Sequence, residues 1–229
     1  MADKKTVEPR QSMLHSALTR LGDIILVNLC FILCCLPVVT IGASVHALYA
    51  ACLAMTDGNE EPTAYFFKIF KADFKQAELG WLVALPLTVI MGLNTLSIIT
   101  YMDAQTEGFM MPLIFSVASL VLLYAYFTMY WLLSARFNVD TKPLFRYSLR
   151  LTLGYLFKLM LVSLLFLLPV ILFLFLPNVL GTLLVVWVML YFTMIASLAV
   201  VLFKKPFREL AEQNGLEPLE KDAPVKEED

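Results

Sequence analysis

The chain has 229 residues with a formal net charge of −2, and 60% of them are hydrophobic while only 16% are charged. A soluble domain is roughly half apolar, so this composition excludes an ordinary soluble protein. It also disfavours a nucleic-acid partner, because phosphate recognition needs a concentrated basic surface.

Residues 1–20 are polar and hold four basic side chains, which predicts a cytoplasmic arm. The stretch resembles a secretory signal peptide, with basic residues followed by an apolar core. We expect no cleavage, because the basic region is long and the apolar run continues where a mature soluble domain would begin.

Residues 24–55 are almost wholly apolar. A single helix of that length would extend about 48 Å, whereas the hydrocarbon core is about 30 Å thick. Pro37 and Gly42 bracket a turn-like stretch, since proline breaks the helix ladder and glycine tolerates a turn. The sequence therefore predicts a helical hairpin over residues 21–56. Its short second arm either spans the membrane or is re-entrant, and the sequence leaves both open.

The second arm of this hairpin carries small residues at helical spacing, which let helices approach closely in lipid. They include Gly42, Ala43, Ala47 and Ala50. Two interpretations stay open: packing within this chain, or a docking surface for another membrane subunit.

Two polar side chains of the hairpin point to interhelical contacts. Asn28 is expected to form a hydrogen bond between helices. His46 is either a hydrogen-bonded packing residue between the hairpin arms or a contact for a substrate.

Residues 62–76 combine an aromatic face with a basic edge, a pattern typical of a helix that lies in the membrane interface. Phe66, Phe70 and Phe74 are part of that face and are candidate contacts for a partner. Residues 79–101 and 109–135 then form two transmembrane helices. Tyr126 and Tyr130 share one face of the second, where they either stack on a sugar or belong to a hydrogen-bonded core.

Residues 141–151 form a second basic segment, in which Arg146 and Arg150 are further candidate partner contacts. Residues 152–176 are expected to cross outward, with a kink or interruption at Pro169, and residues 181–203 to return. The whole makes one membrane domain over residues 21–208. Residues 209–229 are acidic and polar, which predicts a largely disordered cytoplasmic tail.

The basic residues determine the predicted orientation. All 17 Lys and Arg lie in four patches, over residues 4–20, 68–75, 136–158 and 204–226, whereas the connectors at 102–108 and 177–181 contain none. Basic residues stay on the cytoplasmic side of a membrane, so both termini are expected inside a bacterial cell membrane.

The sequence shows no pattern of chemistry-bearing residues. It has no glycine-rich phosphate loop and no paired metal ligands, so no enzyme, metal or cofactor is expected. The middle of the four clear spans holds no charge, which disfavours a stand-alone ion-coupled transporter. The four cysteines lie in apolar sequence and are interpreted as small packing residues.

The hairpin resembles the opening of the YesL-like family of bacterial membrane proteins. The resemblance rests on the run Leu-Pro-Val-Val-Thr-Ile-Gly at residues 36–42, supported by residues 21–23, 47–49 and the aromatic, basic stretch 66–76. The positions that carry the motif are expected to be structural: Asn28, Pro37, Thr40, Gly42 and Tyr49.

The resemblance implies a role in sugar uptake, as an accessory membrane subunit that assembles with the permease subunits of a carbohydrate ABC importer. It supplies no catalytic residues, and ATP would be bound by a partner. A second hypothesis is a signalling partner of a two-component sensor kinase. A third is an autonomous permease for small solutes.

Overall fold

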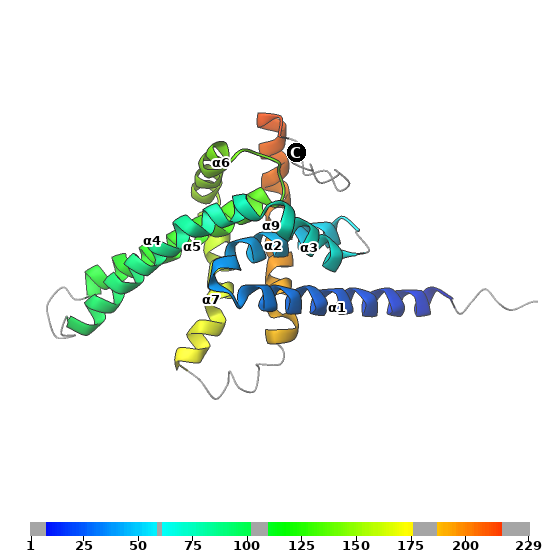
Figure 1. Cartoon of the computed structure of the whole chain (residues 1–229), viewed down its shortest axis with the longest axis horizontal. Coiled ribbons are helices and arrows are strands. Elements are labelled where there is room, and N and C mark those ends of the chain that lie inside the picture. The colour runs from blue at the N-terminus through cyan, green and yellow to red at the C-terminus, as the bar shows by residue number, and fades with distance from the viewer. Residues whose placement is uncertain (1–7, 59–60, 102–109, 176–186, 217–229) are drawn as a thin grey trace, which may run out of the picture.

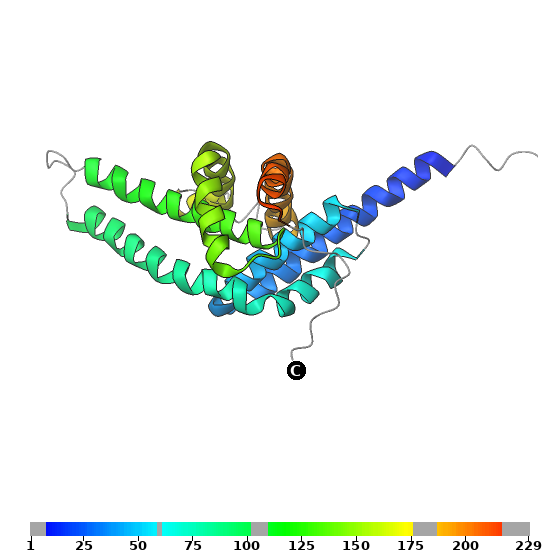
Figure 2. The ribbon, with the colours of Figure 1, turned by 90° about the horizontal axis from the view of Figure 1, so that it is seen from above.

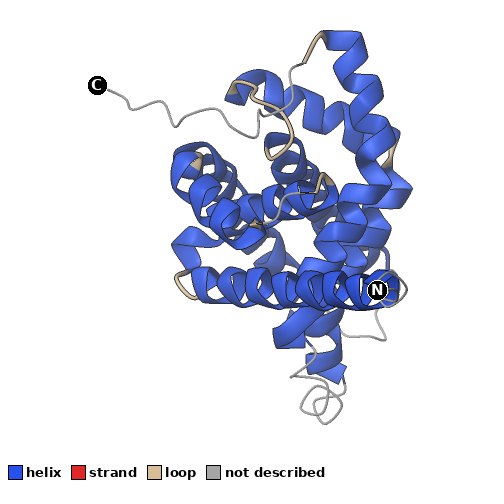
Figure 3. Cartoon of the chain, turned by 90° about the vertical axis from the view of Figure 1, so that its right-hand side faces the viewer, coloured by secondary structure: helices blue, strands red, loops and turns tan. Residues whose placement is uncertain are grey.

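The structure, a computed structural model, describes residues 8–58, 61–101, 110–175 and 187–216 (Figure 1). In these ranges every regular element is helical (Figure 3). Five segments are long and apolar enough to cross a membrane, and a bent pair of helices could supply a sixth. The predicted class, an all-α polytopic membrane bundle that opens with a helical hairpin, is confirmed.

The described elements are all helices and follow one another in this order. They are α1 (Glu8–Cys35), the 3₁₀ turn η1 (Val38–Thr40), α2 (Ile41–Thr56), α3 (Pro62–Ala72), α4 (Phe74–Tyr101), α5 (Met110–Ser134), α6 (Thr141–Gly154), α7 (Leu156–Phe175), the π-helical η2 (Trp187–Tyr191) and α9 (Phe192–Asn214).

Seen from above, the helices form a V (Figure 2). The α1–α2 hairpin makes one limb and the α4–α5 hairpin makes the other. Helices α7 and α9 lie between the limbs, where α7 packs against α5 and α9 packs against α2. The core is therefore at the junction of the limbs, and the outer part of the α4–α5 limb projects away from it.

Helix α2 is the centre of this junction. Of its 16 residues, 12 are buried, and it contacts α1, α3, α4, α5 and α9. The small residues of α2 explain why five helices can pack around it, because short side chains let neighbouring helices approach closely. Gly42, Ala43, Ala47 and Ala50 are all buried within the chain. Their burial favours the first interpretation, packing within this chain.

Several boundaries differ from the sequence prediction. Helix α1 is continuous from Glu8, so residue 21 begins no new element. The predicted helix over 62–76 ends at Ala72, and Phe74 already belongs to α4. Helix α9 continues to Asn214, past the predicted domain end at 208, and stops at Gly215, whose φ of 61° suits glycine. The predicted tail beyond residue 216, the connectors and residues 181–186 lie outside the described residues.

The chain bends between α6 and α7 by 98°. The bend separates the basic segment, which α6 contains, from the apolar helix that follows. Helix α7 runs through Pro169 to Phe175, so the predicted interruption does not occur.

The α4–α5 limb is largely exposed outside its base. In Phe74–Tyr101 only Ala77, Gly80 and Ala84 are buried, and the buried residues of Met110–Ser134 lie almost all from Ala125 onward. The exposed side chains of the outer parts of both helices are mostly apolar. A bilayer is the environment that such a surface requires. The chain is a multi-pass membrane protein.

Candidate functional site

The motif at residues 36–42 forms a turn that its own side chains close. The Thr40 backbone N–H donates to the Pro37 carbonyl at 3.0 Å. The Thr40 hydroxyl reaches the carbonyl of Cys34 at 2.5 Å, which is near the end of α1. Threonine hydroxyls make such local bonds readily, so this residue ties the end of α1 to the start of α2.

The turn is docked onto the first turns of α4. The Trp81 indole N–H donates to the Val38 carbonyl at 2.7 Å. The Glu78 carboxylate accepts from the Ala43 backbone N–H at 3.0 Å, which gives the N-terminus of α2 an anionic partner. A carboxylate and an indole from α4 thus hold the turn in place.

Gly42 allows this contact. A Cβ added there would lie 2.6 Å from the Trp81 Cβ and 2.8 Å from the Ala77 carbonyl oxygen. Those atoms belong to a backbone or to the root of a side chain, so neither can move aside. Glycine is required because the backbones of α2 and α4 approach too closely for any side chain.

Side chains of α5 form hydrogen bonds to the backbone of the same turns of α4. The Tyr130 hydroxyl donates to the Gln76 carbonyl at 3.0 Å, and the Trp131 indole N–H donates to the Ala77 carbonyl at 3.3 Å. The Tyr130 ring fills the space beside Gly80, where a Cβ would lie 2.3 Å from the ring. The start of α4 is therefore the point where α2, α4 and α5 are joined.

The two tyrosines predicted as sugar contacts are both occupied by these packing interactions. Tyr130 is fully buried. Tyr126 is half-buried, donates to the Phe145 carbonyl at 3.2 Å and stacks on the Phe145 ring. The structure favours the second interpretation, a hydrogen-bonded core.

His46 connects three elements. Its Nδ1 lies 2.7 Å from the Ser134 hydroxyl at the end of α5, and its Nε2 lies 3.2 Å from the Asp73 carboxylate between α3 and α4. The histidine is hydrogen-bonded, as one interpretation expected. Its partners come from other helices, so the expected place between the hairpin arms is wrong.

A serine, a histidine and an aspartate in a chain also make up the apparatus of many hydrolases. Here the imidazole is 2% exposed and Ser134 is 4% exposed. Neither of the two cavities described below is lined by any of the three residues. With the imidazole and the hydroxyl both buried, the arrangement is suited to joining helices.

Asn28 makes the bond expected of it. Its side-chain oxygen accepts from the Thr193 backbone N–H at 2.9 Å and from the Thr193 hydroxyl at 3.2 Å. Both residues are fully buried. The backbone donor becomes available where the π-helical η2 passes into α9, so the asparagine ties α1 to the last helix.

The other motif and candidate positions divide between core and surface. Tyr49 is buried and packs edge-on against Phe166. Phe66 is fully buried, while Phe70 and Phe74 continue its row of ring contacts, so the aromatic side of α3 packs on α2. Arg146 and Arg150 are exposed on α6.

A cavity of about 220 Å³ lies among the aromatic side chains of the core, between Tyr49, Trp81, Phe127 and Phe192. Its walls are mainly apolar, with Thr88 and Thr128 as polar groups. It suits an apolar group. The predicted substrate contacts His46, Tyr126 and Tyr130 do not line it.

Sequence reasoning missed the charged residues that hold the elements together: Asp57, Asp73, Glu78 and Arg136. Asp57 pairs with Arg136 at 3.2 Å although 79 positions separate them. Tyr65 lies within electrostatic reach of two of these carboxylates. Burial raises the pKa of its phenol, and Asp73 and Asp57 raise that pKa further. No local pattern marks such pairs, because folding alone brings them together.

Residues 24–95 match a family described as "Protein of unknown function, DUF624". The matched stretch contains the turn at residues 36–42 and also Glu78 and Trp81, the two α4 residues that hold it. No curated protein and no solved structure matches the chain, so the resemblance to YesL-like proteins stays a prediction.

Proposed function

We propose that the chain is an accessory integral membrane subunit of a carbohydrate ABC importer, and that it assembles with the permease subunits in a bacterial cell membrane. The resemblance of its hairpin motif supports the class of system. Both termini are cytoplasmic in this proposal, and a partner ATPase binds the ATP.

One observation carries the assembly role: the exposed α4–α5 limb. Its apolar side chains include Leu82 at 70% exposure, Ile90 at 64% and Phe115 at 72%. The limb is long enough to cross the bilayer and contacts little of its own chain in its outer part. A subunit that binds another subunit in the membrane needs an exposed apolar surface of this kind. The small residues of α2 do not provide one, because they are buried within the chain.

The test is capture of the neighbour in the native membrane. A photo-crosslinking amino acid replaces Ile90 or Leu93 on the limb, and in a control it replaces Val201, which is 59% exposed on α9. We expect the limb positions to capture a permease subunit and the α9 position to capture lipid alone. Equal capture from both helices contradicts the limb as the contact surface.

Affinity purification in mild detergent, followed by mass spectrometry, identifies the assembly. Stoichiometric ABC permease subunits support the proposal. Co-purification of a sensor kinase supports the signalling hypothesis instead, and a homo-oligomer that transports solute in liposomes supports the autonomous permease.

Genetics separates the first two outcomes. Deletion of the gene should abolish sugar uptake while the permease is still present in the membrane. Normal uptake by a constitutively expressed importer, with changed expression of the transport genes, contradicts the accessory role.

A further inference from the structure

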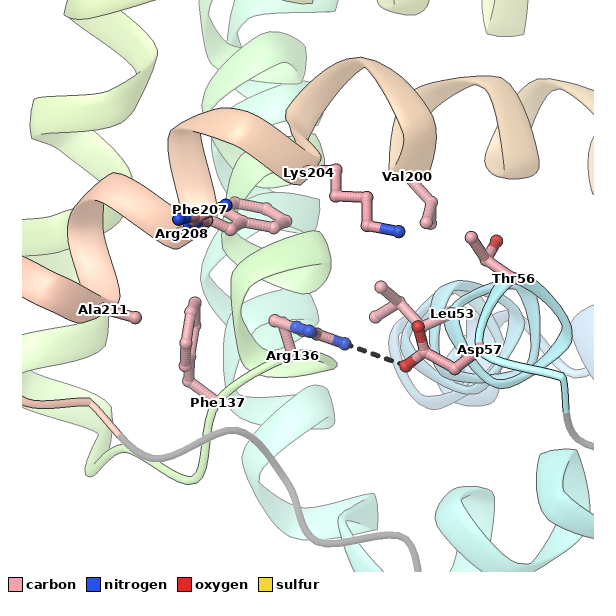
Figure 4. Close-up of a pocket in the computed structure, with 10 residues that line it drawn as sticks. All are labelled: Leu53, Thr56, Asp57, Arg136, Phe137, Val200, Lys204, Phe207, Arg208 and Ala211. Carbon is pink, nitrogen blue, oxygen red and sulfur yellow. Dashed lines mark hydrogen bonds and ion pairs between the residues drawn. The ribbon is translucent and has the colours of Figure 1, made fainter.

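A second cavity, of about 230 Å³, lies where the end of α2, the residues after α5 and helix α9 meet (Figure 4). Its charged lining comes from three separate parts of the chain: Asp57, Arg136, Lys204 and Arg208. Leu53, Phe137 and Phe207 are among its apolar lining residues.

The lining is cationic. Arg136 donates from Nη1 to the Asp57 carboxylate at 3.2 Å, which positions the guanidinium at the cavity. A guanidinium has five N–H donors, so this bond leaves others for a ligand. The Lys204 amine points toward the same space (Figure 4). Arg208 also lines the cavity, but its guanidinium pairs with Glu212 at 2.9 Å, so Arg136 and Lys204 are the cations directed at a ligand.

The cavity lies at the end of two candidate membrane spans. Helix α5 ends at Ser134, two residues before Arg136, and the apolar part of α9 ends at Phe203, next to Lys204. The site is therefore at the boundary between hydrocarbon and water on the basic side of the protein, where the bilayer presents anionic headgroups.

The combination of cationic and apolar side chains in the lining indicates the class of ligand. A free phosphate needs cations and hydrogen-bond donors but gains nothing from the Phe137 and Phe207 rings. An anionic phospholipid uses both, because its phosphate lies next to an apolar glycerol ester region. Basic pockets between membrane helices bind anionic lipid headgroups in this way.

We propose that this cavity binds the headgroup phosphate of an anionic phospholipid. Arg136 and Lys204 contact the phosphate oxygens, and Phe137 and Phe207 contact the glycerol end of the acyl chains. Asp57 orients Arg136. The bound lipid contacts residues from the ends of α2 and α5 and from α9.

The test measures lipid binding to the full chain by native mass spectrometry, with phosphatidylglycerol as the probe and phosphatidylcholine as the zwitterionic reference. We expect phosphatidylglycerol to bind more tightly. Lys204→Gln should weaken its binding about fivefold, the effect of one cation close to a lipid surface.

The matched control is Lys205→Gln. Lys205 is the next residue, carries the same charge and is 86% exposed, but it pairs with Glu209 and does not line the cavity. It should leave the preference for phosphatidylglycerol nearly unchanged. Equal weakening by the two variants overturns the proposal, since it would mean general attraction to the surface.

A second variant tests the space rather than the charge. Ala211→Leu places a larger apolar side chain in the cavity wall without changing any cation, and it should also weaken phosphatidylglycerol binding. Unchanged binding in this variant contradicts the site. The soluble compound sn-glycerol 3-phosphate identifies the source of the phosphate: equal affinity for it, lost in Lys204→Gln, overturns the assignment to a lipid.

Discussion

At the scale of single residues, the motif at residues 36–42 has a physical explanation. Thr40 closes the turn, Gly42 removes the steric barrier to α4, and the Glu78 carboxylate and the Trp81 indole satisfy backbone groups of the turn. Each of these roles is structural, as the resemblance implied for Thr40 and Gly42.

Gly42→Ala should destabilise the protein by about 1–3 kcal/mol, the usual cost of overpacking a tight contact. The new Cβ would meet the Trp81 Cβ and the Ala77 carbonyl, so α2 must move away from α4. The thermal unfolding midpoint in detergent measures the effect. Gly92→Ala is the control, because a Cβ at Gly92 meets nothing within 4 Å and should leave stability unchanged or slightly higher.

Asn28→Ala should cost about 1–2 kcal/mol, because the buried Thr193 backbone N–H then lacks its acceptor. The same unfolding measurement applies. The control is Ser163→Ala, which removes a buried hydroxyl that has no hydrogen-bond partner in the structure and should cost nothing. Similar losses in the two variants would show that the asparagine contributes only its volume.

At the scale of elements, a small group of polar side chains, Asn94, Thr95 and Ser116, joins α4 to α5 within an otherwise apolar limb. We call this group the polar seam. The Thr95 hydroxyl lies 2.6 Å from that of Ser116, and the Asn94 amide donates to the same serine at 3.2 Å. Ser116 is 5% exposed. One buried serine on α5 therefore connects two adjacent residues of α4.

Ser116→Ala should loosen the limb, since Asn94 and Thr95 then lose their partner on α5. Hydrogen exchange of the backbone amides in α4 and α5 beyond residue 85 should become faster, while exchange in α2 stays the same. Ser119→Ala is the matched change, because that hydroxyl donates only to the Ser116 carbonyl of its own helix. If both variants exchange alike, the seam does not join the helices.

At the scale of the whole molecule, the ion pair and the cavity bring distant parts of the chain to one level. Asp57 follows α2, Arg136 follows α5 and Lys204 belongs to α9. These three positions must therefore face the same side of the membrane. In the proposed orientation, that side is the cytoplasm.

Cysteine labelling in intact cells tests this arrangement. In a background without Cys30, Cys34, Cys35 and Cys52, single cysteines at Asp103 and Asn178 should react with an impermeant reagent, and those at Asp57 and Glu209 should not. Opposite results at Asp57 and Glu209 would contradict the structure, whatever the orientation. Labelling of both from outside would reverse the proposed orientation alone.

Much of the architecture could be predicted because its signals are local. Apolar runs, Pro37, Gly42 and the placement of basic residues follow from the requirement that backbone groups and charges avoid hydrocarbon. The sequence therefore sufficed for the all-α class, the hairpin and most helix ends within a few residues.

The roles of particular side chains depended on the tertiary structure. Small residues on α2 suit both packing and docking, and only the five helices around α2 decide between them. The same holds for Tyr130, which is equally able to stack on a sugar or to donate to Gln76. The sequence by itself determined which segments enter the membrane, because the free energy of transfer from water to lipid depends on the length and apolar composition of each segment. Which helices then meet, and so which of Asp57, Arg136 and Lys204 share a cavity, was decided by packing between segments far apart in the chain.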